Sequence, residues 1–241
     1  MKQPHLLIDE GDVHETVFVP GSPNRVERIG RVMDTYEEVS GNREYNIING
    51  EYKDARISVC STGIGSPSTA IAIEELANVG AKNLIRVGTA GGLQRDVEIG
   101  DMVVATGAAK FEGTTKRYES VEYPAVPSLD VTNALVNSAR RHGEDVHVGP
   151  IVTDDAFYAE DEPAKDWHEA GMVAVEMEAS ALFSLCRRNG LKSGAIVTVD
   201  GNLILGTQKG ETDEGELPEK ARNNVERAIQ IALDAVVEGD F

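Results

Sequence analysis

Short apolar segments alternate with amphipathic segments along nearly the whole chain, which predicts strands and helices in turn. Apolar runs rich in β-branched residues predict strands at residues 16–19, 55–60, 83–87, 101–106 and 193–199, and another near Val146. Apolar positions at helical spacing predict helices at residues 25–33, 67–79, 131–142, 178–188 and 219–237. We expect Ser66 to cap the second helix, Pro67 to begin it and Gly80 to end it.

This alternation is typical of the α/β class, and it predicts a three-layer α/β/α sandwich around a mostly parallel, mixed central sheet. No Pro-, Gly- or Ser-rich linker divides the sequence, so residues 1–241 are expected to form a single domain. Ligands of such folds bind beyond the carboxyl ends of the strands. The residues that directly follow each predicted strand are therefore the first candidates for a functional site.

The charge balance narrows the range of partners. Lys and Arg number 23 against 41 Asp and Glu, a formal net charge of −18, which argues against nucleic acid or an anionic membrane as the partner. Cys60 and Cys186 both lie in apolar contexts, and the first residues lack the basic and apolar regions of a secretory signal. We therefore expect a cytoplasmic protein with reduced thiols.

Basic residues near glycine-rich turns are candidates for binding a small anion. Arg25 follows the turn at Gly21, Arg43 lies in a polar segment, and Arg86 ends an apolar strand just before Thr89. Guanidinium groups, glycine amides and a hydroxyl are suitable donors for phosphate. Each arginine can instead pair with a surface acid, although a charge at the end of an apolar strand needs a partner.

Acidic and aromatic residues supply a second set of candidates. Glu176 and Glu178 precede a predicted helix and can accept both hydroxyls of a ribose, although Glu178 can also simply favour the helix dipole. Asp200 ends a predicted strand, where it can donate a proton to a leaving group or begin an Asp-Gly turn. Phe157 offers a face for a planar base, or it belongs to the core.

Six segments in this order resemble those of the purine nucleoside and uridine phosphorylases, and the similarity extends from His5 to the final helix. The segments are PGSPNR at 20–25, NREY at 42–45, CSTGIGSPS at 60–68, IRVGTAGG at 85–92, VEMEA at 175–179 and VDG at 199–201. The resemblance implies an enzyme that cleaves a nucleoside with inorganic phosphate, releasing free base and ribose 1-phosphate in nucleoside salvage or catabolism.

The resemblance also implies a role for each matching residue. One subunit would bind phosphate through Gly21, Arg25, Arg86 and Thr89. Arg43 of a neighbouring subunit would complete this site. The ribose 5′-hydroxyl would contact His5 of the neighbour. Its 2′- and 3′-hydroxyls would contact Glu178 and the Met177 backbone, with Glu176 close by. The base would stack on Phe157. The enzyme would therefore be a homo-oligomer, at least a dimer and commonly a hexamer built as a trimer of dimers.

In the same resemblance Asp200 protonates N7 of a purine, while Arg86 holds the attacking phosphate. No cofactor, metal or protein nucleophile is required. In uridine phosphorylases, residues like Glu44, Ile64 and Ser68 surround a monovalent cation at a subunit interface, which makes these three residues a candidate cation site.

The preferred base stays open between two alternatives. Uridine phosphorylases recognise uracil through a Gln-x-Arg pair shortly after the aromatic residue and an arginine near the position of Leu203, and both elements are absent here. However, residues 60–68 and 123–126 look closer to uridine phosphorylases. We expect purine or broad-range activity, with uridine phosphorylase as the main alternative. A hydrolytic nucleosidase would need no phosphate site, and a non-catalytic nucleoside-binding protein would need no acid at Asp200.

Overall fold

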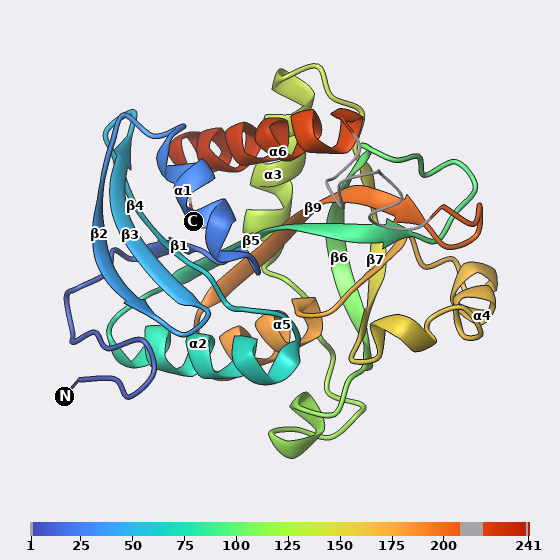
Figure 1. The fold of residues 1–241 in the computed structure, drawn as a ribbon, viewed down its shortest axis with the longest axis horizontal. Helices are drawn as coiled ribbons and strands as arrows, with labels where there is room; N and C mark the ends of the chain where they lie inside the picture. The colour runs from blue at the N-terminus through green and yellow to red at the C-terminus, as the bar shows by residue number, and fades with distance from the viewer. Residues whose placement is uncertain (1, 208–218, 240) are drawn as a thin grey trace.

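The computed structural model describes residues 2–207, 219–239 and 241, and its strands form one mixed sheet (Figure 1). The strands are β1 (Thr16–Phe18), β2 (Thr35–Asn42), β3 (Tyr45–Tyr52), β4 (Ala55–Cys60), β5 (Asn83–Gly92), β6 (Met102–Phe111), β7 (His147–Asp154), β8 (Ala174–Glu176) and β9 (Lys192–Asn202). Their order is β2-β3-β4-β1-β5-β8-β7-β6-β9. Strands β4, β1, β5 and β9 run parallel to one another, so their carboxyl ends meet at one edge of the sheet.

Helices cover both faces of this sheet, which confirms the predicted mixed α/β class and its three layers. One face carries α1 (Pro23–Gly30), α3 (Leu129–Arg141) and α6 (Glu219–Glu238), and the other carries α2 (Ser66–Asn78) and α5 (Ala179–Arg188) (Figure 1). The short helix α4 (Ala164–Glu169) and the 3-10 turns η1 (Thr115–Arg117) and η2 (Phe157–Ala159) lie in connections.

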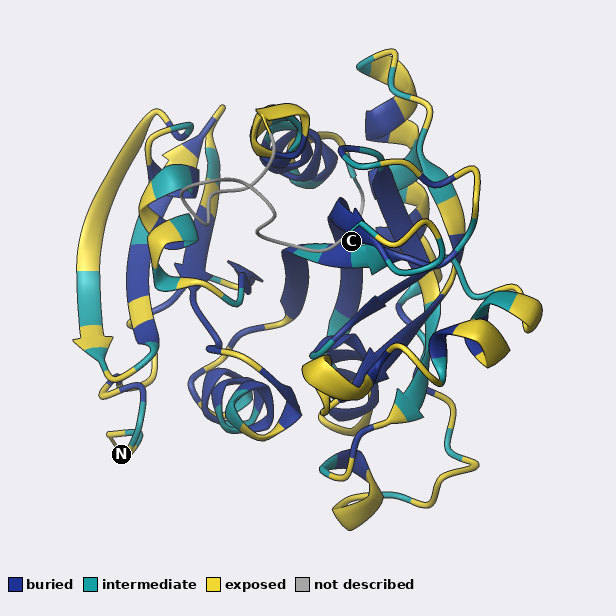
Figure 2. Ribbon diagram, turned by 45° about the vertical axis from the view of Figure 1, so that its right-hand side comes forward, coloured by how far each residue is buried: buried dark blue, intermediate teal, exposed yellow. Residues whose placement is uncertain are grey.

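Alternate residues of the central strands pack into two separate cores. Leu84 of β5 packs against α2 and α5, whereas Ile85 and Val87 pack against the layer that contains α6. Burial on both faces explains why the central strands are continuously apolar in sequence. Helix α5 is buried all round over residues 179–186, whereas α1, α3 and α6 also carry exposed residues (Figure 2).

Five strands close on themselves, which the alternation of elements does not predict. β5 pairs with both β8 and β9, while β8, β7, β6 and β9 pair in succession. The sheet therefore curls into a small barrel at one end. This closure brings Val175 and Ala174 of β8 beside Gly91 and Gly92 of β5, which come more than 80 positions earlier in the chain.

Two local expectations were wrong, and one hairpin was not predicted. β5 continues to Gly92 through the glycine-rich segment that was expected to end it, because pairing with β9 extends along its whole length. The sequence did not predict the hairpin of β2 and β3, since β2 is largely polar and exposed. Helix α2 is capped by Gly65 at φ 89°, while the Ser66 hydroxyl donates a hydrogen bond to the Met177 carbonyl at 3.2 Å.

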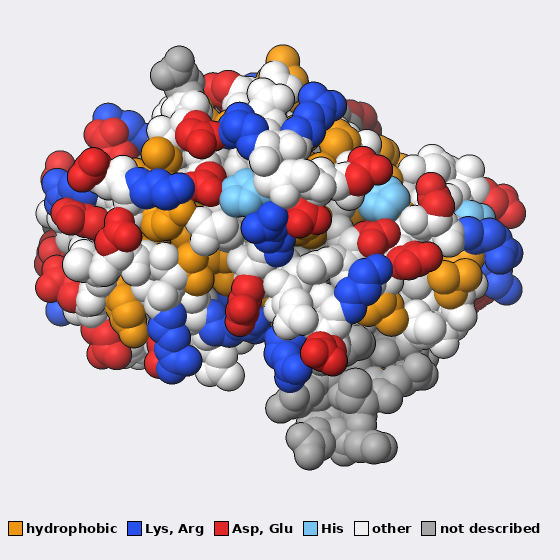
Figure 3. Space-filling view, turned by 90° about the horizontal axis from the view of Figure 1, so that it is seen from above, with side chains coloured by type: hydrophobic (Ala, Val, Ile, Leu, Met, Phe, Trp, Pro, Cys, Tyr) orange, Lys and Arg blue, Asp and Glu red, His pale blue; other side chains and the backbone are white. Residues whose placement is uncertain are grey.

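The acidic surface carries both signs of charge in alternation on the face of α6 (Figure 3). Ion pairs join this helix to its neighbours, as Arg28 with Glu226, Arg141 with Glu238, and Arg227 with Glu144. Such exposed pairs each stabilise a fold by at most about 1 kcal/mol. Among the described residues, no helix combines the length and apolar character that a membrane crossing requires.

Candidate active site

The predicted site residues gather where β1, β4, β5 and β9 end. The loops that follow β1 and β4 are joined by two backbone hydrogen bonds, from Thr62 N to Pro20 O at 2.9 Å and from Gly63 N to Gly21 O at 3.0 Å. A Cβ atom at position 21 would lie 3.2 Å from the Gly63 carbonyl oxygen and 3.9 Å from Arg86 Nη1. Glycine at position 21 thus allows two loops and one guanidinium group to approach closely.

Arg86 is the centre of this cluster and is almost fully buried. Its Nε lies 2.9 Å from Glu176 Oε2, and its Nη2 lies 2.5 Å from Glu178 Oε2. Burial lowers the pKa of Arg86, but the carboxylates of Glu178 and Glu176 outweigh it and raise the pKa. Arg86 therefore pairs with acids, but these are two buried acids of the site and not the surface acids of the alternative interpretation.

One side of this arginine faces a second guanidinium group. Arg86 Nη1 is buried and has no hydrogen-bond partner among the described residues, and the same holds for Arg25 Nε. Arg25 Nη1 donates to the Val87 carbonyl at 3.3 Å. Burial and the charges of Arg86 and Arg28 lower the pKa of Arg25 to about 10. A buried cation, Arg86, and a half-buried one, Arg25, each with a buried unused donor, are well suited to bind an anion.

Glycine at position 88 permits this placement of Arg86. A Cβ atom at Gly88 would lie 2.9 Å from Cζ and from Nη2 of Arg86, so the guanidinium group lies directly over the strand backbone. Real Cβ contacts essentially never become that short. The glycine-rich sequence of β5 therefore serves side-chain placement rather than a break in the strand.

Hydrogen bonds from Thr153 and from two backbone amides hold the Glu176 carboxylate in place. Thr153 Oγ1, on neighbouring β7, donates to Glu176 Oε1 at 2.7 Å, and the amide of Glu178 donates to Oε2 at 2.9 Å. The Ala179 amide adds contacts of 3.0 Å to both oxygens. These donors fix the carboxylate that in turn orients Arg86. Thr153 could not be predicted from the sequence, because its role depends on the pairing of β7 with β8.

Glu178 faces the opposite loop rather than capping its own helix. It occupies the N-cap position of α5 without a side-chain capping bond, and Oε1 accepts a hydrogen bond of 2.6 Å from the Gly65 amide. Oε2 contacts Arg86. Met177 beside it is half-buried. The Glu178 carboxylate thus lies between the guanidinium group of Arg86 and the loop at residues 63–65.

Asp200 lies inside β9 and not in a turn, which excludes the turn alternative. Ala90 pairs with Val199 and Gly91 with Gly201, so Asp200 is the extra residue of a β-bulge. Bulges beside functional sites redirect a side chain out of the regular alternation. Asp200 is 3% exposed, and its charge acts on both Arg25 and Glu160.

Phe157 and Thr89 also lie at the sheet edge, whereas Arg43 and His5 do not contact the site of their own chain. Phe157 is 44% exposed and stacks edge-on against Tyr158, so it is not a core residue. Thr89 is half-buried within β5. Arg43 is exposed at the tip of the β2–β3 hairpin with φ 55°, and His5 Nδ1 lies 2.6 Å from Glu75 on α2.

The three residues of the candidate cation site lie close together. A Cβ atom at Gly63 would lie 2.7 Å from Glu44 Cγ and 3.2 Å from Ser68 Oγ, and Ile64 beside it is 79% exposed. Ser68 Oγ donates to the Ile64 carbonyl at 3.1 Å. No cluster of three or more His, Cys, Asp or Glu residues suited to a metal occurs in the described ranges.

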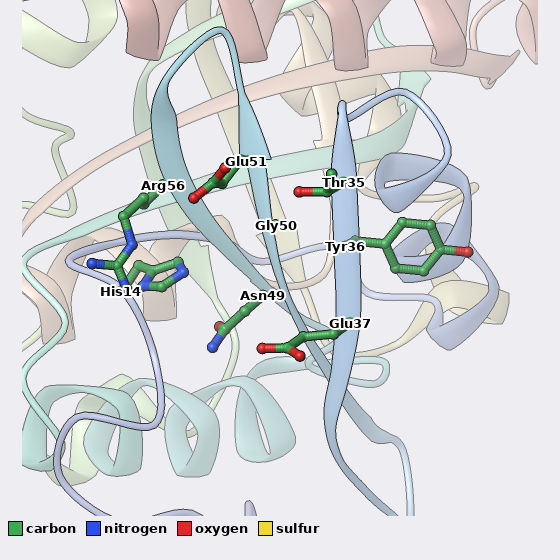
Figure 4. A pocket seen from close by; sticks show the side chains of 8 residues that line it. All are labelled: His14, Thr35, Tyr36, Glu37, Asn49, Gly50, Glu51 and Arg56. Carbon is green, nitrogen blue, oxygen red and sulfur yellow. The ribbon is translucent and has the colours of Figure 1, made fainter.

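A separate open groove of about 340 Å³ lies on the β2–β3–β4 edge of the sheet (Figure 4). His14, Glu51 and Arg56 are among its lining residues. Burial and the charge of Arg56 lower the pKa of His14. None of the predicted site residues lines this groove, so it is distinct from the cluster around Arg86.

Comparison with known proteins gives consistent findings over almost the entire chain. The model of one family, the phosphorylase superfamily, matches residues 15–238. Guanosine phosphorylase of Halorubrum lacusprofundi is 60% identical over 236 residues, which cover 98% of each chain. Uridine phosphorylase from Vibrio fischeri superposes with a TM-score of 0.91 at 36% identity, covering 98% of both chains. Purine nucleoside phosphorylase from Toxoplasma gondii superposes with a TM-score of 0.89 at 32% identity, covering 98% of this chain and 96% of the other.

Proposed function

Because the chain belongs to the phosphorylase superfamily, and within it to the nucleoside phosphorylases, which are pentosyltransferases, we propose that it cleaves purine nucleosides with inorganic phosphate. The observation that carries the choice of base is Asp200, a buried acid that a β-bulge directs out of β9 beside the arginine cluster. The 60% identity to a guanosine phosphorylase supports the same choice. Guanosine is accordingly the first substrate to test.

Phosphate would bind against the donors that Arg86 and Arg25 leave unused. Arg86 Nη1 and Arg25 Nε are buried donors on adjacent cations, and Gly21 and Thr89 lie at the same sheet edge. Burial, followed by the charges of Arg86 and Arg28, lowers the pKa of Arg25, and an anion bound there would stabilise its charged form. A bound phosphate dianion stabilises the positive charge that develops on the ribose ring and then attacks C1′.

The ribose and base would lie on the other side of Arg86. Glu178 offers a carboxylate to the ribose hydroxyls, Met177 and Glu176 complete the contacts, and the exposed ring of Phe157 stacks on the base. Cleavage of the glycosidic bond leaves electrons on the purine, and a proton from Asp200 to N7 neutralises them. No covalent enzyme intermediate is needed, because phosphate is the nucleophile.

A homo-oligomer fits the placement of the remaining predicted residues. Arg43 is exposed, and the imidazole ring of His5 contacts Glu75 of α2. We propose that both complete the site of a neighbouring subunit, in a dimer or in a hexamer of three dimers. Residues 1–241 would form one nucleoside phosphorylase domain that acts in cytoplasmic nucleoside catabolism. The cation site at Glu44, Ile64 and Ser68 stays a prediction.

The substitution Asp200→Asn tests the base assignment. It keeps the size of the side chain but removes the transferable proton, so guanosine cleavage should fall by roughly 100-fold or more, the usual scale for a lost general acid. Uracil has no N7, so uridine cleavage should fall much less. The ratio of kcat/KM for guanosine to that for uridine, measured in the wild type and the variant, gives the result. An unchanged ratio, or a wild type that cleaves only uridine, would replace the purine assignment with uridine phosphorylase.

A further inference from the structure

Glu112 is a buried acid that has no place in the mechanism above. It directly follows β6 and is only 1% exposed. Its Oε2 accepts a hydrogen bond of 2.9 Å from the Thr115 amide. Its Oε1 accepts hydrogen bonds from the hydroxyl groups of Thr115 and Ser180, the latter at 3.2 Å. The Glu112 carboxylate therefore joins the 3-10 turn η1 to helix α5.

The first turn of α5 supplies backbone amides to the residues that support Arg86. The first amides of a helix have no partner within the helix, so they are available for such contacts. Two of them donate to the Glu176 carboxylate, and the amide of Ser180 donates to Thr153 Oγ1 at 2.9 Å. Ser180 thus contacts Thr153 through its amide and Glu112 through its hydroxyl group.

The direction of each hydrogen bond in this series follows from its donors and acceptors. An ionised carboxylate only accepts, so the Ser180 hydroxyl donates to Glu112. The Thr153 hydroxyl accepts from the Ser180 amide, and its single hydrogen is directed to Glu176 Oε1 at 2.7 Å. Glu176 Oε2 in turn lies 2.9 Å from Arg86 Nε. Four buried residues therefore connect η1 to the guanidinium group of Arg86.

We propose that Glu112 is a positioning residue for the phosphate site. It acts on Arg86 through a series of three residues, Ser180, Thr153 and Glu176. The inference rests on the proposed function, in which Arg86 Nη1 is a donor to phosphate. Because a guanidinium group is planar and rigid, a displacement at Nε also moves Nη1. Loss of the Glu112 carboxylate would allow the first turn of α5 to shift, together with the acid that holds Nε.

This role predicts a larger effect on phosphate than on the nucleoside. In the proposed function the ribose contacts Glu178, whose Oε1 is held separately by the Gly65 amide at 2.6 Å. That hydrogen bond comes from the loop after β4 and does not involve Glu112. Loss of Glu112 should therefore raise the KM for phosphate much more than the KM for guanosine. A purely local role in holding η1 would instead lower the Tm and leave both KM values unchanged.

The substitution Glu112→Gln provides the test, because it keeps the shape of the side chain but removes its charge and one acceptor oxygen. Glu122→Gln, which is exposed in the same connection between β6 and α3, is the matched control. The measurements are kcat, the KM for phosphate and for guanosine, and the Tm. A displacement of Arg86 by less than an ångström predicts a roughly 10-fold increase in the KM for phosphate. The KM for guanosine should change less than about threefold, and Glu122→Gln should match the wild type.

A second variant tests the route through α5. Ser180→Ala removes the hydroxyl group at the other end of the same hydrogen bond and keeps the amide that contacts Thr153. It should also raise the KM for phosphate, and the double variant should equal Glu112→Gln alone, because both changes remove one contact. If Glu112→Gln does not fold, Ser180→Ala decides the question.

Several results would overturn the positioning role of Glu112. These are an unchanged KM for phosphate in folded Glu112→Gln or in Ser180→Ala, equal increases in the KM for both substrates, and additive effects in the double variant. A wild type that cleaves guanosine equally well without phosphate would instead refute the proposed function, so the two failures are distinguishable.

Discussion

Substitution of Gly88 by Ala perturbs the site without removing any functional side chain. The new methyl group would lie 2.9 Å from Cζ and Nη2 and 3.2 Å from Nε of Arg86, whereas ordinary contacts begin at about 3.4 Å. The guanidinium group must therefore move by about half an ångström. It is not free to do so, since Glu176 holds Nε at 2.9 Å and Glu178 holds Nη2 at 2.5 Å.

Two consequences of this displacement can be estimated. Overpacking of a tight buried site costs about 1–3 kcal/mol, which for a chain of this size lowers the Tm by a few degrees. Misplacement of Arg86 Nη1 weakens a charge-assisted hydrogen bond to phosphate, a contact worth about 1.5–3 kcal/mol. At about 1.4 kcal/mol per factor of ten, the KM for phosphate should increase roughly 10- to 100-fold.

The assay is phosphorolysis of guanosine at saturating nucleoside with phosphate varied, accompanied by a thermal melt of each protein. Gly107→Ala in β6 is the matched control, because a Cβ atom there would lie 3.5 Å from the Ala125 carbonyl oxygen, an ordinary contact. This control should leave the KM for phosphate unchanged. A Gly88→Ala enzyme that melts lower but keeps the wild-type KM for phosphate would refute the assignment of Arg86 to the phosphate.

Two further predictions concern assembly and pH. Mixing Arg43→Ala with Arg86→Ala under subunit exchange should restore activity, because some mixed dimers contain one intact site; demonstrated exchange without recovery would contradict the shared site. The pKa of Glu160 is raised from 4.5 to about 7 in the folded protein, so its ionisation destabilises the fold increasingly between those values. Glu160→Gln should accordingly raise the Tm at pH 8 more than at pH 5. Equal Tm shifts at both pH values would show that ionisation of Glu160 does not destabilise the folded protein.

The layered fold follows from the sequence because its signals are local. Apolar β-branched runs and amphipathic spacing located the first residues of five strands, and both ends of five helices, to within about three residues. β5 and β6 each continue five residues beyond the predicted end. Gly80, at φ 104°, ends α2 as expected. Pairing between distant strands leaves no local signal. The closure of β5 onto both β8 and β9, and the polar strand β2 at the sheet edge, therefore emerged only from the structure.

The same distinction applies to the site. Residues that follow parallel strands meet at one sheet edge, which explains why Gly21, Arg86 and Asp200 could be predicted to lie together. The buried pairing of Arg86 with Glu176 could not be predicted, because it depends on the contact of β5 with β8. The burial of Glu160 gave no signal either, since its neighbours in sequence are exposed.

The most direct test of the account is the phosphate dependence of guanosine cleavage. Purified protein incubated with guanosine should release guanine and ribose 1-phosphate in equal amounts when phosphate is present, as followed by base absorbance and phosphorus NMR. In phosphate-free buffer the release of guanine should stop, because the attacking group that Arg25 and Arg86 are placed to hold is absent. Equal release of guanine with and without phosphate, with free ribose as the product, would identify a hydrolytic nucleosidase and contradict the account.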